Sequence, residues 1–238
     1  MLLLGSNGYD YIDIDPFGSP NAFLDAAIRR LGRAGILAIT ATDTSSLAGS
    51  YPRACKRNYW AVPCDGPRKH EVGLRILVRK VQLVAAQHDK ALTPVLVYNK
   101  DHYYRAYFRC EKRKQAADDL LKLHGAWEDE PAAGPLWLGR LTDVKLVAKM
   151  ADAVETTMQG TEKEKDAMRT FLTTIVAENS LAEGVTHYHF LNDLNRSARG
   201  VRKETLFEQF PGMVAPTHHT QNAVRSTLTA EEIVQMLK

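Results

Sequence analysis

The sequence lacks the features that define several common protein classes. Its 238 residues include only three cysteines, without the paired spacing of a zinc site or the density of a disulfide-rich secreted domain. No apolar run approaches the ~20 residues that a membrane-spanning helix needs, and Met1–Leu4 is too short for the core of a signal peptide. These absences predict a reduced cytoplasmic protein with no metal site and no membrane segment.

A further absence concerns cofactor binding. Sheets that bind nucleotide-like cofactors usually begin with a strand and a glycine-rich turn, followed by an acidic residue for the ribose. No such turn precedes Tyr9, and Gly5–Gly8 is interpreted as a surface turn. The net charge of +3 suits a polyanionic partner but identifies none, because local patches matter more than their sum.

The most informative stretch that is present is YDYIDIDPFGSP, residues 9–20. Aromatic and β-branched residues dominate its first half and predict a buried strand. Pro16 cannot donate a hydrogen bond to a sheet, so the strand stops and opens into a loop. Ligands of open α/β sheets bind outside the carboxyl ends of strands, which makes this loop the candidate binding site.

The loop residues Asp15, Pro16 and Phe17 suit one chemistry. A carboxylate and a backbone carbonyl can each accept one hydrogen of a nucleobase amine, so that the nitrogen lone pair points at an electrophile. A phenylalanine ring can stack on the face of the base. The alternative is a simple turn in which Asp15 caps the following helix.

The rest of the first half predicts the alternating elements of an α/β sheet. Ser19 or Asn21 is expected to cap the helix that follows the loop, and the longest helix is expected to carry a basic face. Residues 47–67, rich in glycine and proline, are predicted to be a loop. Strands are expected at residues 35–41, 92–98 and 103–111, the last two as an antiparallel hairpin, and helices at residues 21–33, 69–89 and 112–122.

Several of these segments hold candidate contacts to a nucleic acid. Thr42 and Asp43 follow a strand beside the loop, although Asp43 also suits a helix cap. Residues 47–67 interleave cations with aromatic rings, which suits phosphates and unstacked bases, or else a solvated loop with partly buried rings. The candidate substrate contacts are Gly18, Thr42, Asp43, Arg53, Arg57, Tyr59, His70, Arg75, His102, Tyr103 and Arg105.

The second half predicts mainly helices. Thr142, Thr161 and Thr229 are expected to cap three of them, Thr229 in a capping box. The HYHF segment at His187–Phe190 is too isolated a signal to predict a metal site. A linker is expected at residues 126–134, a strand at 135–141, helices at 142–158, 162–179, 191–200, 203–210 and 229–238, and a basic loop with Arg196, Arg199, Arg202 and Lys203.

Six motifs, in this order, resemble those of the tRNA guanine-26 N2-dimethyltransferase family. They are DIDPFGSP, TATD, HEVGLRIL, DHYYRAY, GPLWLG and THHTQNAVRS, and they extend over nearly the whole chain. The resemblance implies transfer of methyl groups from S-adenosylmethionine to the exocyclic N2 of guanine 26 in tRNA. It implies that Asp15, Pro16 and Phe17 are catalytic, that Asp15 and Pro16 also contact the cofactor, and that tRNA contacts the candidate residues above.

The same resemblance implies a fold and a domain organisation. Residues 1–112 would form the C-terminal half of a Rossmann-like class I methyltransferase sheet that ends in an antiparallel hairpin, and residues 113–238 a smaller mixed α+β domain that binds tRNA. The missing glycine-rich turn then predicts that the chain begins in the middle of the catalytic domain and lacks the first half of the cofactor site. The chain is expected to be a monomer. The alternatives are a tRNA-binding fragment without activity of its own, or an amino-methyltransferase that acts on DNA adenine or protein glutamine.

Overall fold

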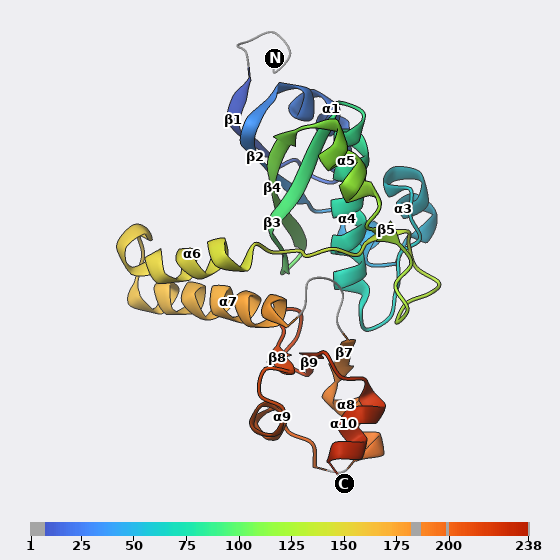
Figure 1. The fold of residues 1–238 in the computed structure, drawn as a ribbon, viewed down its shortest axis with the longest axis vertical. Helices are drawn as coiled ribbons and strands as arrows, with labels where there is room; N and C mark the ends of the chain where they lie inside the picture. Colours follow the sequence, from blue (N-terminus) through green and yellow to red (C-terminus); the bar gives the residue numbers. More distant parts are fainter. Residues whose placement is uncertain (1–7, 182–186, 199, 238) are drawn as a thin grey trace. The chain divides into compact units, whose positions relative to one another are not determined.

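The computed structural model describes residues 8–181, 187–198 and 200–237 and divides the chain into two compact units (Figure 1). These units are Met1–Leu141 and Thr142–Lys238. The sequence analysis placed the division at residue 112, whereas residues 113–141 belong to the first unit. The functions assigned to the two parts stay predictions. The predicted turn at residues 5–7 and Arg199 of the predicted basic loop lie outside the described residues.

The first unit is built on a mixed four-stranded sheet. β1 pairs with β2 in parallel, whereas β4 runs antiparallel to both β2 and β3. The strands predicted in this half and the predicted hairpin are therefore confirmed. In spatial order the strands are β1 (Tyr9–Ile14), β2 (Leu31–Ala41), β4 (Tyr103–Lys112) and β3 (Lys90–Lys100).

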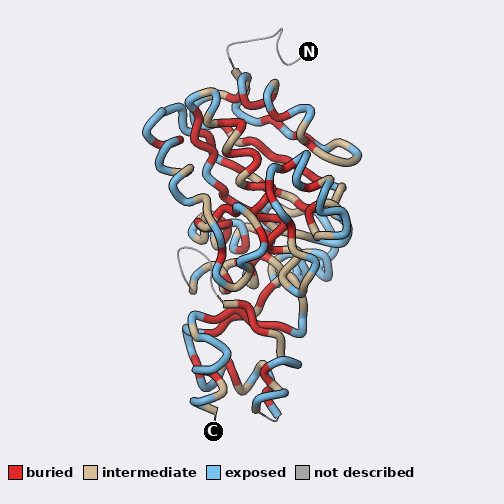
Figure 2. The backbone as a smooth tube through the Cα atoms, turned by 90° about the vertical axis from the view of Figure 1, so that its right-hand side faces the viewer, coloured by how far each residue is buried: buried red, intermediate tan, exposed pale blue. Residues whose placement is uncertain are grey.

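One face of this sheet forms the core of the unit. Along β1, Ile12 and Ile14 are buried, whereas Tyr11 and Asp13 are exposed, as the alternation of side chains along a strand requires. Buried backbone is concentrated in the interior of the unit (Figure 2). Burial of this apolar face is the main force that holds the unit together. The helices on that side of the sheet are α1 (Asn21–Arg30), α4 (Lys69–Ala86) and α5 (Lys114–Leu121) (Figure 1).

Two expectations about these helices were wrong. Neither Ser19 nor Asn21 is the N-cap of α1, because that position falls on Pro20, although Oγ of Ser19 accepts a hydrogen bond from the N–H of Asn21 at 3.3 Å. The helix α4 shows no basic face, because α2, α3 and β6 pack against it in addition to the sheet. Arg75 and Lys80 of α4 are consequently buried, with 2% and 6% of their surface exposed.

The segment predicted as a loop at 47–67 contains helical structure. A short helix α2 (Thr44–Leu47) is followed by α3 (Pro52–Tyr59). Pro52 lies in the first turn of α3, where its missing N–H has no partner to lose and its fixed φ favours the helix. Cys55 and Tyr59, four residues apart, form the buried side of α3. Trp60 ends the helix in the left-handed conformation, with φ of 58°.

Gly18 and Gly49 give a matched test of how closely the chain packs around Gly49. Gly18 and Gly49 have φ of +87° and +91°. A Cβ at Gly18 would meet nothing within 4 Å, whereas at Gly49 it would lie 2.5 Å from the carbonyl oxygen of Cys64. We expect Gly18→Ala to lower the free energy of unfolding by about 1–2 kcal/mol through backbone strain. Gly49→Ala should lower it by about 1–3 kcal/mol more through overpacking. Equal losses in urea unfolding would contradict this packing.

Residues 124–141 are packed more closely than the predicted linker and strand suggest. Only the short strands β5 (His124–Gly125) and β6 (Leu136–Trp137) form, as an antiparallel pair. Trp127, in the middle of the predicted linker, is only 3% exposed. Arg68 at the start of α4 forms an ion pair with Glu130, with 3.2 Å between Nη1 and Oε1. The segment is thus a structural part of the first unit.

The second unit contains a helical pair, α6 (Val144–Thr157) and α7 (Glu162–Ser180), which pack against each other. Asp143 caps α6 with its side chain, so the prediction of Thr142 as the cap was wrong by one residue. Thr161 caps α7 as predicted, in a capping box with Glu164.

The remainder of the second unit is a small antiparallel sheet with three short helices. Thr229 caps the last helix in the predicted capping box. Leu206, Phe210 and Ile233 belong to the apolar cluster that joins the helices to the sheet. In spatial order the strands are β7 (His187–Phe190), β9 (Ala223–Ser226) and β8 (Val214–Pro216), and the helices are α8 (Leu191–Ser197), α9 (Lys203–Gln209) and α10 (Ala230–Met236).

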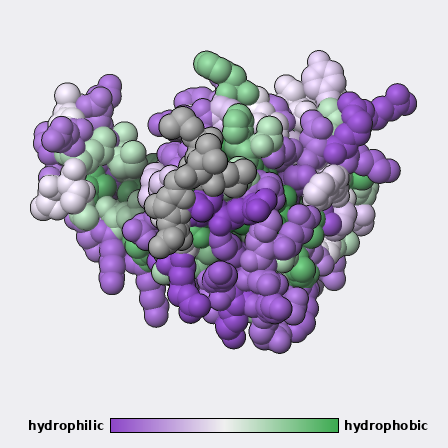
Figure 3. Space-filling view, turned by 90° about the horizontal axis from the view of Figure 1, so that it is seen from above, coloured by the Kyte–Doolittle hydropathy of each residue, from purple (hydrophilic) through white to green (hydrophobic). Residues whose placement is uncertain are grey.

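The face shown in Figure 3 is mainly hydrophilic, with separate hydrophobic patches. Among the residues that the structure describes, no helix combines the length and the apolar composition that crossing a membrane would require.

Candidate active site

The loop after β1 presents the three residues that the sequence singled out. Asp15 is exposed and forms no ion pair within the described part of the chain. Pro16 is half-buried, and Phe17 is fully exposed, at 106% relative exposure. The carboxylate is thus not consumed by a neighbouring arginine, and the ring is available for stacking against a ligand.

Two hydrogen bonds attach this loop to the carboxyl end of β2. The N–H of Gly18 donates to Oγ1 of Thr42 at 2.6 Å, and the N–H of Thr42 donates to the carbonyl of Gly18 at 3.0 Å. Gly18 accommodates its positive φ without strain, which lets the chain turn back at this point. The structure therefore brings Thr42 to the loop, as predicted, but as part of its framework.

A second connection runs from the loop to helix α3 through Tyr59. The Tyr59 hydroxyl donates to both carboxylate oxygens of Asp43, at 2.7 and 2.9 Å. Because that proton is committed to Asp43, Ser19 is the donor in its 3.0 Å bond with the Tyr59 hydroxyl. Nδ2 of Asn21 also donates to the carbonyl of Asn58, at 2.9 Å.

Burial shifts the pKa values of both groups in this connection, the Asp43 carboxyl and the Tyr59 hydroxyl. It raises the pKa of the Asp43 carboxyl, although the hydrogen bond from Tyr59 opposes the shift. It also raises the pKa of the Tyr59 hydroxyl, and the neighbouring Asp43 adds to this effect. Tyr59 was predicted to contact RNA, but it is 0% exposed and instead joins α3 to the loop.

Asp13 and Arg105 form an ion pair on the exposed face of the sheet. Nη1 and Nη2 of Arg105 lie 2.8 and 2.6 Å from the two carboxylate oxygens of Asp13. Nη1 also donates to Oγ1 of Thr40 at 2.6 Å, so the pair spans three strands. The hydrogen bond from Arg105 lowers the pKa of Asp13. Arg105 was predicted to contact RNA, but its guanidinium is engaged by Asp13.

The hairpin residues lie at the same end of the sheet as the loop. Tyr104 is opposite Ala41 in the register of β4 with β2, so the β3–β4 turn lies beside the carboxyl end of β2. His102 in that turn is exposed, and Tyr103 is half-buried. His70 at the start of α4 lies here too, with Nδ1 3.1 Å from the Tyr104 hydroxyl.

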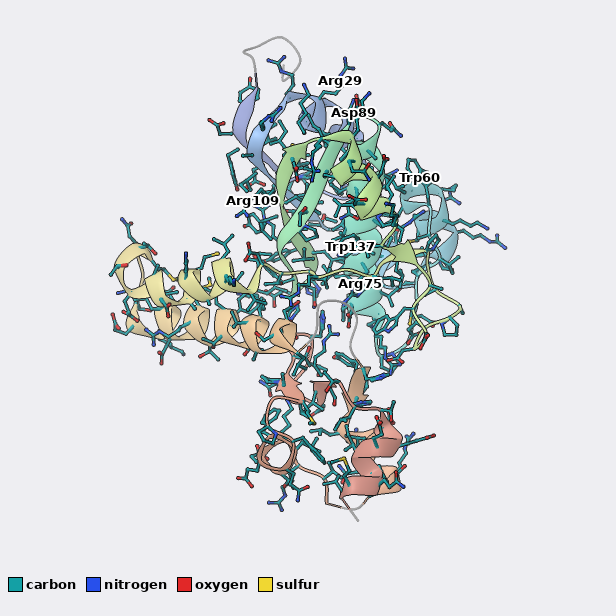
Figure 4. The ribbon with its side chains drawn as sticks, viewed as in Figure 1. Arg29, Trp60, Arg75, Asp89, Arg109 and Trp137 are labelled. Atoms are coloured by element: carbon teal, nitrogen blue, oxygen red, sulfur yellow. The ribbon has the colours of Figure 1, made fainter. Side chains whose placement is uncertain are left out.

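Arg75 is not at the site. Its Nη1 donates to the carbonyls of Trp137 and Gly139, at 2.9 and 3.0 Å, and its Nε to Glu71 at 2.9 Å. Figure 4 shows Arg75 on α4 beside Trp137. The prediction that Arg75 contacts RNA was therefore wrong, because its donors face the interior.

Sequence reasoning missed Ser19 and Asn21 as partners of α3. It considered both only as helix caps, and no local signal indicates a hydrogen bond to residues almost forty positions away. Arg53 and Arg57, in contrast, are exposed on α3, as a contact to RNA requires.

A family model described as N2,N2-dimethylguanosine tRNA methyltransferase matches residues 1–129, which include the loop, α3 and the sheet. The chain belongs to this family. This confirms the resemblance inferred from the six motifs.

Curated members of the N2,N2-dimethylguanosine tRNA methyltransferase family are similar over different lengths. A tRNA (guanine(26)-N(2))-dimethyltransferase of Thermococcus kodakarensis is 42% identical over 161 residues, which cover 61% of this chain and 43% of that protein. A tRNA (guanine(26)-N(2)/guanine(27)-N(2))-dimethyltransferase of Aquifex aeolicus is 31% identical over 97% of this chain and 64% of its own length. The chain spans less than half the length of the archaeal relative.

A solved structure in the family has the same fold. Trm1 from Pyrococcus horikoshii, in complex with S-adenosyl-L-methionine, matches with a TM-score of 0.84 and 31% identity. The match covers 96% of this chain and 66% of that one. The predicted fold class, an α/β sheet of the class I methyltransferase type followed by a smaller α+β part, is thereby confirmed.

Proposed function

We propose that the chain acts in the methylation of tRNA at the exocyclic N2 of guanine 26, with the base held by the loop Asp15–Phe17. The observation that carries this proposal is the arrangement of that loop. A carboxylate without an ion pair among the described residues and a fully exposed ring lie two residues apart in the loop at the carboxyl end of a strand, in a chain of the dimethylguanosine methyltransferase family.

The loop would position the amine and accept its proton. The Asp15 carboxylate and the Pro16 carbonyl each accept one hydrogen of the N2 amine, which directs the nitrogen lone pair away from the ring plane. As the nitrogen gains a carbon substituent it releases one proton, and the Asp15 carboxylate is placed to accept it. Phe17 stacks on the guanine, which must first leave its helical stack to reach the loop.

The residues present also fit part of a cofactor site. S-adenosylmethionine, the molecule in the Pyrococcus horikoshii complex, supplies an electrophilic methyl group when bound. Asp15 and Pro16 are the residues that we expect to contact it, because they open the carboxyl end of β1, where ligands of such sheets bind. The monomeric state, the cytoplasmic location and the position of the chain within the catalytic domain stay predictions.

Methyl transfer to a defined nucleoside tests the proposal. The chain is incubated with S-adenosylmethionine labelled in its methyl group and an unmodified tRNA transcript, and the digested nucleosides are separated. We expect label in N2-methylated guanosine and its loss with a transcript that carries adenine at position 26, which has no N2 amine. Label that persists in the adenine transcript would refute guanine 26 as the target.

A second candidate function is tRNA binding without transfer. The exposed cations of α3 favour it independently of the loop. Salt-sensitive tRNA binding, together with no heat of S-adenosylmethionine binding in calorimetry, would assign the chain to this function.

A further inference from the structure

Helix α3 carries a cluster of basic residues that form no ion pair with the carboxylates of the described residues. Arg53, Lys56 and Arg57 are exposed and lie on one side of the helix, because their spacing is i, i+3 and i+4. The helix sequence PRACKRNY contains no acidic residue. Within the described ranges of the chain, none of these three side chains forms an ion pair.

Three exposed cations elsewhere in the first unit, around α5, are instead paired with carboxylates. Around α5, Arg113 lies 2.7 Å from Glu111, Lys114 lies 3.8 Å from Asp89, and Lys122 lies 2.8 Å from Asp119. Such pairs are typical of a solvated charged surface. The cations of α3 thus leave a concentrated positive charge for which the first unit offers no partner among its described residues.

Exposed aromatic rings lie at both ends of the same helix. Tyr51 precedes α3 and is 64% exposed, and Trp60 follows it and is 46% exposed. Figure 4 shows Trp60 beside α3. The ammonium of Lys80 lies 3.1 Å from the centroid of the Trp60 ring, and Arg79 donates to the Trp60 carbonyl at 3.2 Å. These contacts hold the ring in place at the end of the basic helix.

We propose that this surface, formed by Tyr51, Arg53, Lys56, Arg57 and Trp60, binds the RNA substrate, with its cations on phosphates and its rings against unstacked bases. Positive charge combined with exposed rings suits a single-stranded or looped nucleic acid. The inference rests on the proposed function and extends it, because it assigns the gripping of RNA to a surface outside the base-holding loop.

The hydrogen bonds of α3 give this surface a direct relation to the loop. The buried side of α3 carries Tyr59, which is bonded to Ser19 directly after the loop, and the Asn58 carbonyl accepts from Asn21. The exposed side of the same helix therefore has a fixed position relative to Asp15–Phe17. RNA bound on α3 would deliver a neighbouring nucleotide to the loop in a defined place.

The salt dependence of RNA binding tests the cations. Binding of a fluorescent, unmodified tRNA transcript is measured by anisotropy between about 50 and 200 mM salt, without cofactor. For Arg53→Gln/Lys56→Gln/Arg57→Gln we expect a slope of log affinity against log salt that is smaller by about two to three, and binding at least about tenfold weaker at low salt. The matched control Arg113→Gln/Lys114→Gln/Lys122→Gln removes the same charge from paired positions and should change the slope by less than about one.

The fluorescence of Trp60 tests the rings independently. The other two tryptophans, Trp127 and Trp137, are only 3% and 2% exposed, so acrylamide reaches mainly Trp60. We expect the tRNA transcript to protect this fluorescence from acrylamide and the protection to disappear in Trp60→Phe. Thermal unfolding of each variant checks that it folds like the parent chain.

Several outcomes would overturn the inference. They are tRNA binding that the two triple variants weaken equally, tRNA binding that leaves Trp60 as accessible as before, and no tRNA binding at all. Polyglutamate that displaces tRNA at equal charge concentration would assign the surface to an acidic protein instead. Neither of these two tests depends on methyl transfer. RNA binding on α3 together with no label transfer in the methylation assay would refute the proposed catalysis and leave this inference standing.

Discussion

Asp15→Ala is expected to lower the rate of methyl transfer by about 10²- to 10⁴-fold, the usual contribution of a positioned acid or base. The substitution removes both the acceptor that orients the amine and the group that takes its proton. The affinity for tRNA should change no more than about a few fold, because Asp15 would touch only the target base of the tRNA, whereas most of the affinity comes from cations on phosphates. Single-turnover transfer and anisotropy on the same preparation measure the two effects separately.

The chain offers a matched control for this substitution at the other end of the same strand. Asp10 is also an exposed carboxylate of β1, but it lies at the opposite end of the strand from the loop. Asp10→Ala should therefore leave methyl transfer within about twofold of the parent chain. If Asp15→Ala keeps full turnover, or if both variants lose activity alike, Asp15 acts only as a turn residue and the proposed mechanism is wrong.

The parts of the fold that sequence predicted well are those with local physical signals. β1 was predicted because a run of aromatic and β-branched residues ends at Pro16, and the cap Thr229 because Glu232 follows it three residues on. The helix α3 was missed because glycine and proline surround it, although Pro52 itself suits a first helical turn. Local signals thus located most elements, although two of the predicted caps lay one residue away from the observed N-cap.

The contacts within the candidate site could not be predicted from sequence, since most of them join residues far apart in the chain. Sequence predicted the loop and the exposed arginines of α3, whose roles depend on their own chemistry. It did not predict that Tyr59 would bond Asp43, or that Arg105 would be engaged by Asp13. A basic residue in a sequence does not reveal whether it faces solvent or a buried carboxylate, because the answer depends on strand register and helix packing.

Arg75 is the clearest case of such a buried cation, and its removal should have the largest effect on stability. Arg75 and Glu71 are 2% and 1% exposed, with 2.9 Å between Nε and Oε1. Arg75→Met leaves the Glu71 carboxylate buried without its cation and the carbonyls of Trp137 and Gly139 without their donor. We expect the free energy of unfolding, measured in urea, to fall by about 3–5 kcal/mol.

Two further variants distinguish the cost of leaving a buried charge unpaired from the cost of removing an arginine side chain. Arg79→Met, one turn further along α4, removes a half-buried arginine with a single 3.2 Å bond to the Trp60 carbonyl, and should cost about 1–2 kcal/mol. The double variant Arg75→Met/Glu71→Met removes both charges, so it should be more stable than Arg75→Met alone, because no unpaired carboxylate remains in the interior. A double variant that is less stable than the single one would show that the carbonyls of Trp137 and Gly139, not the charge of Glu71, make Arg75 necessary.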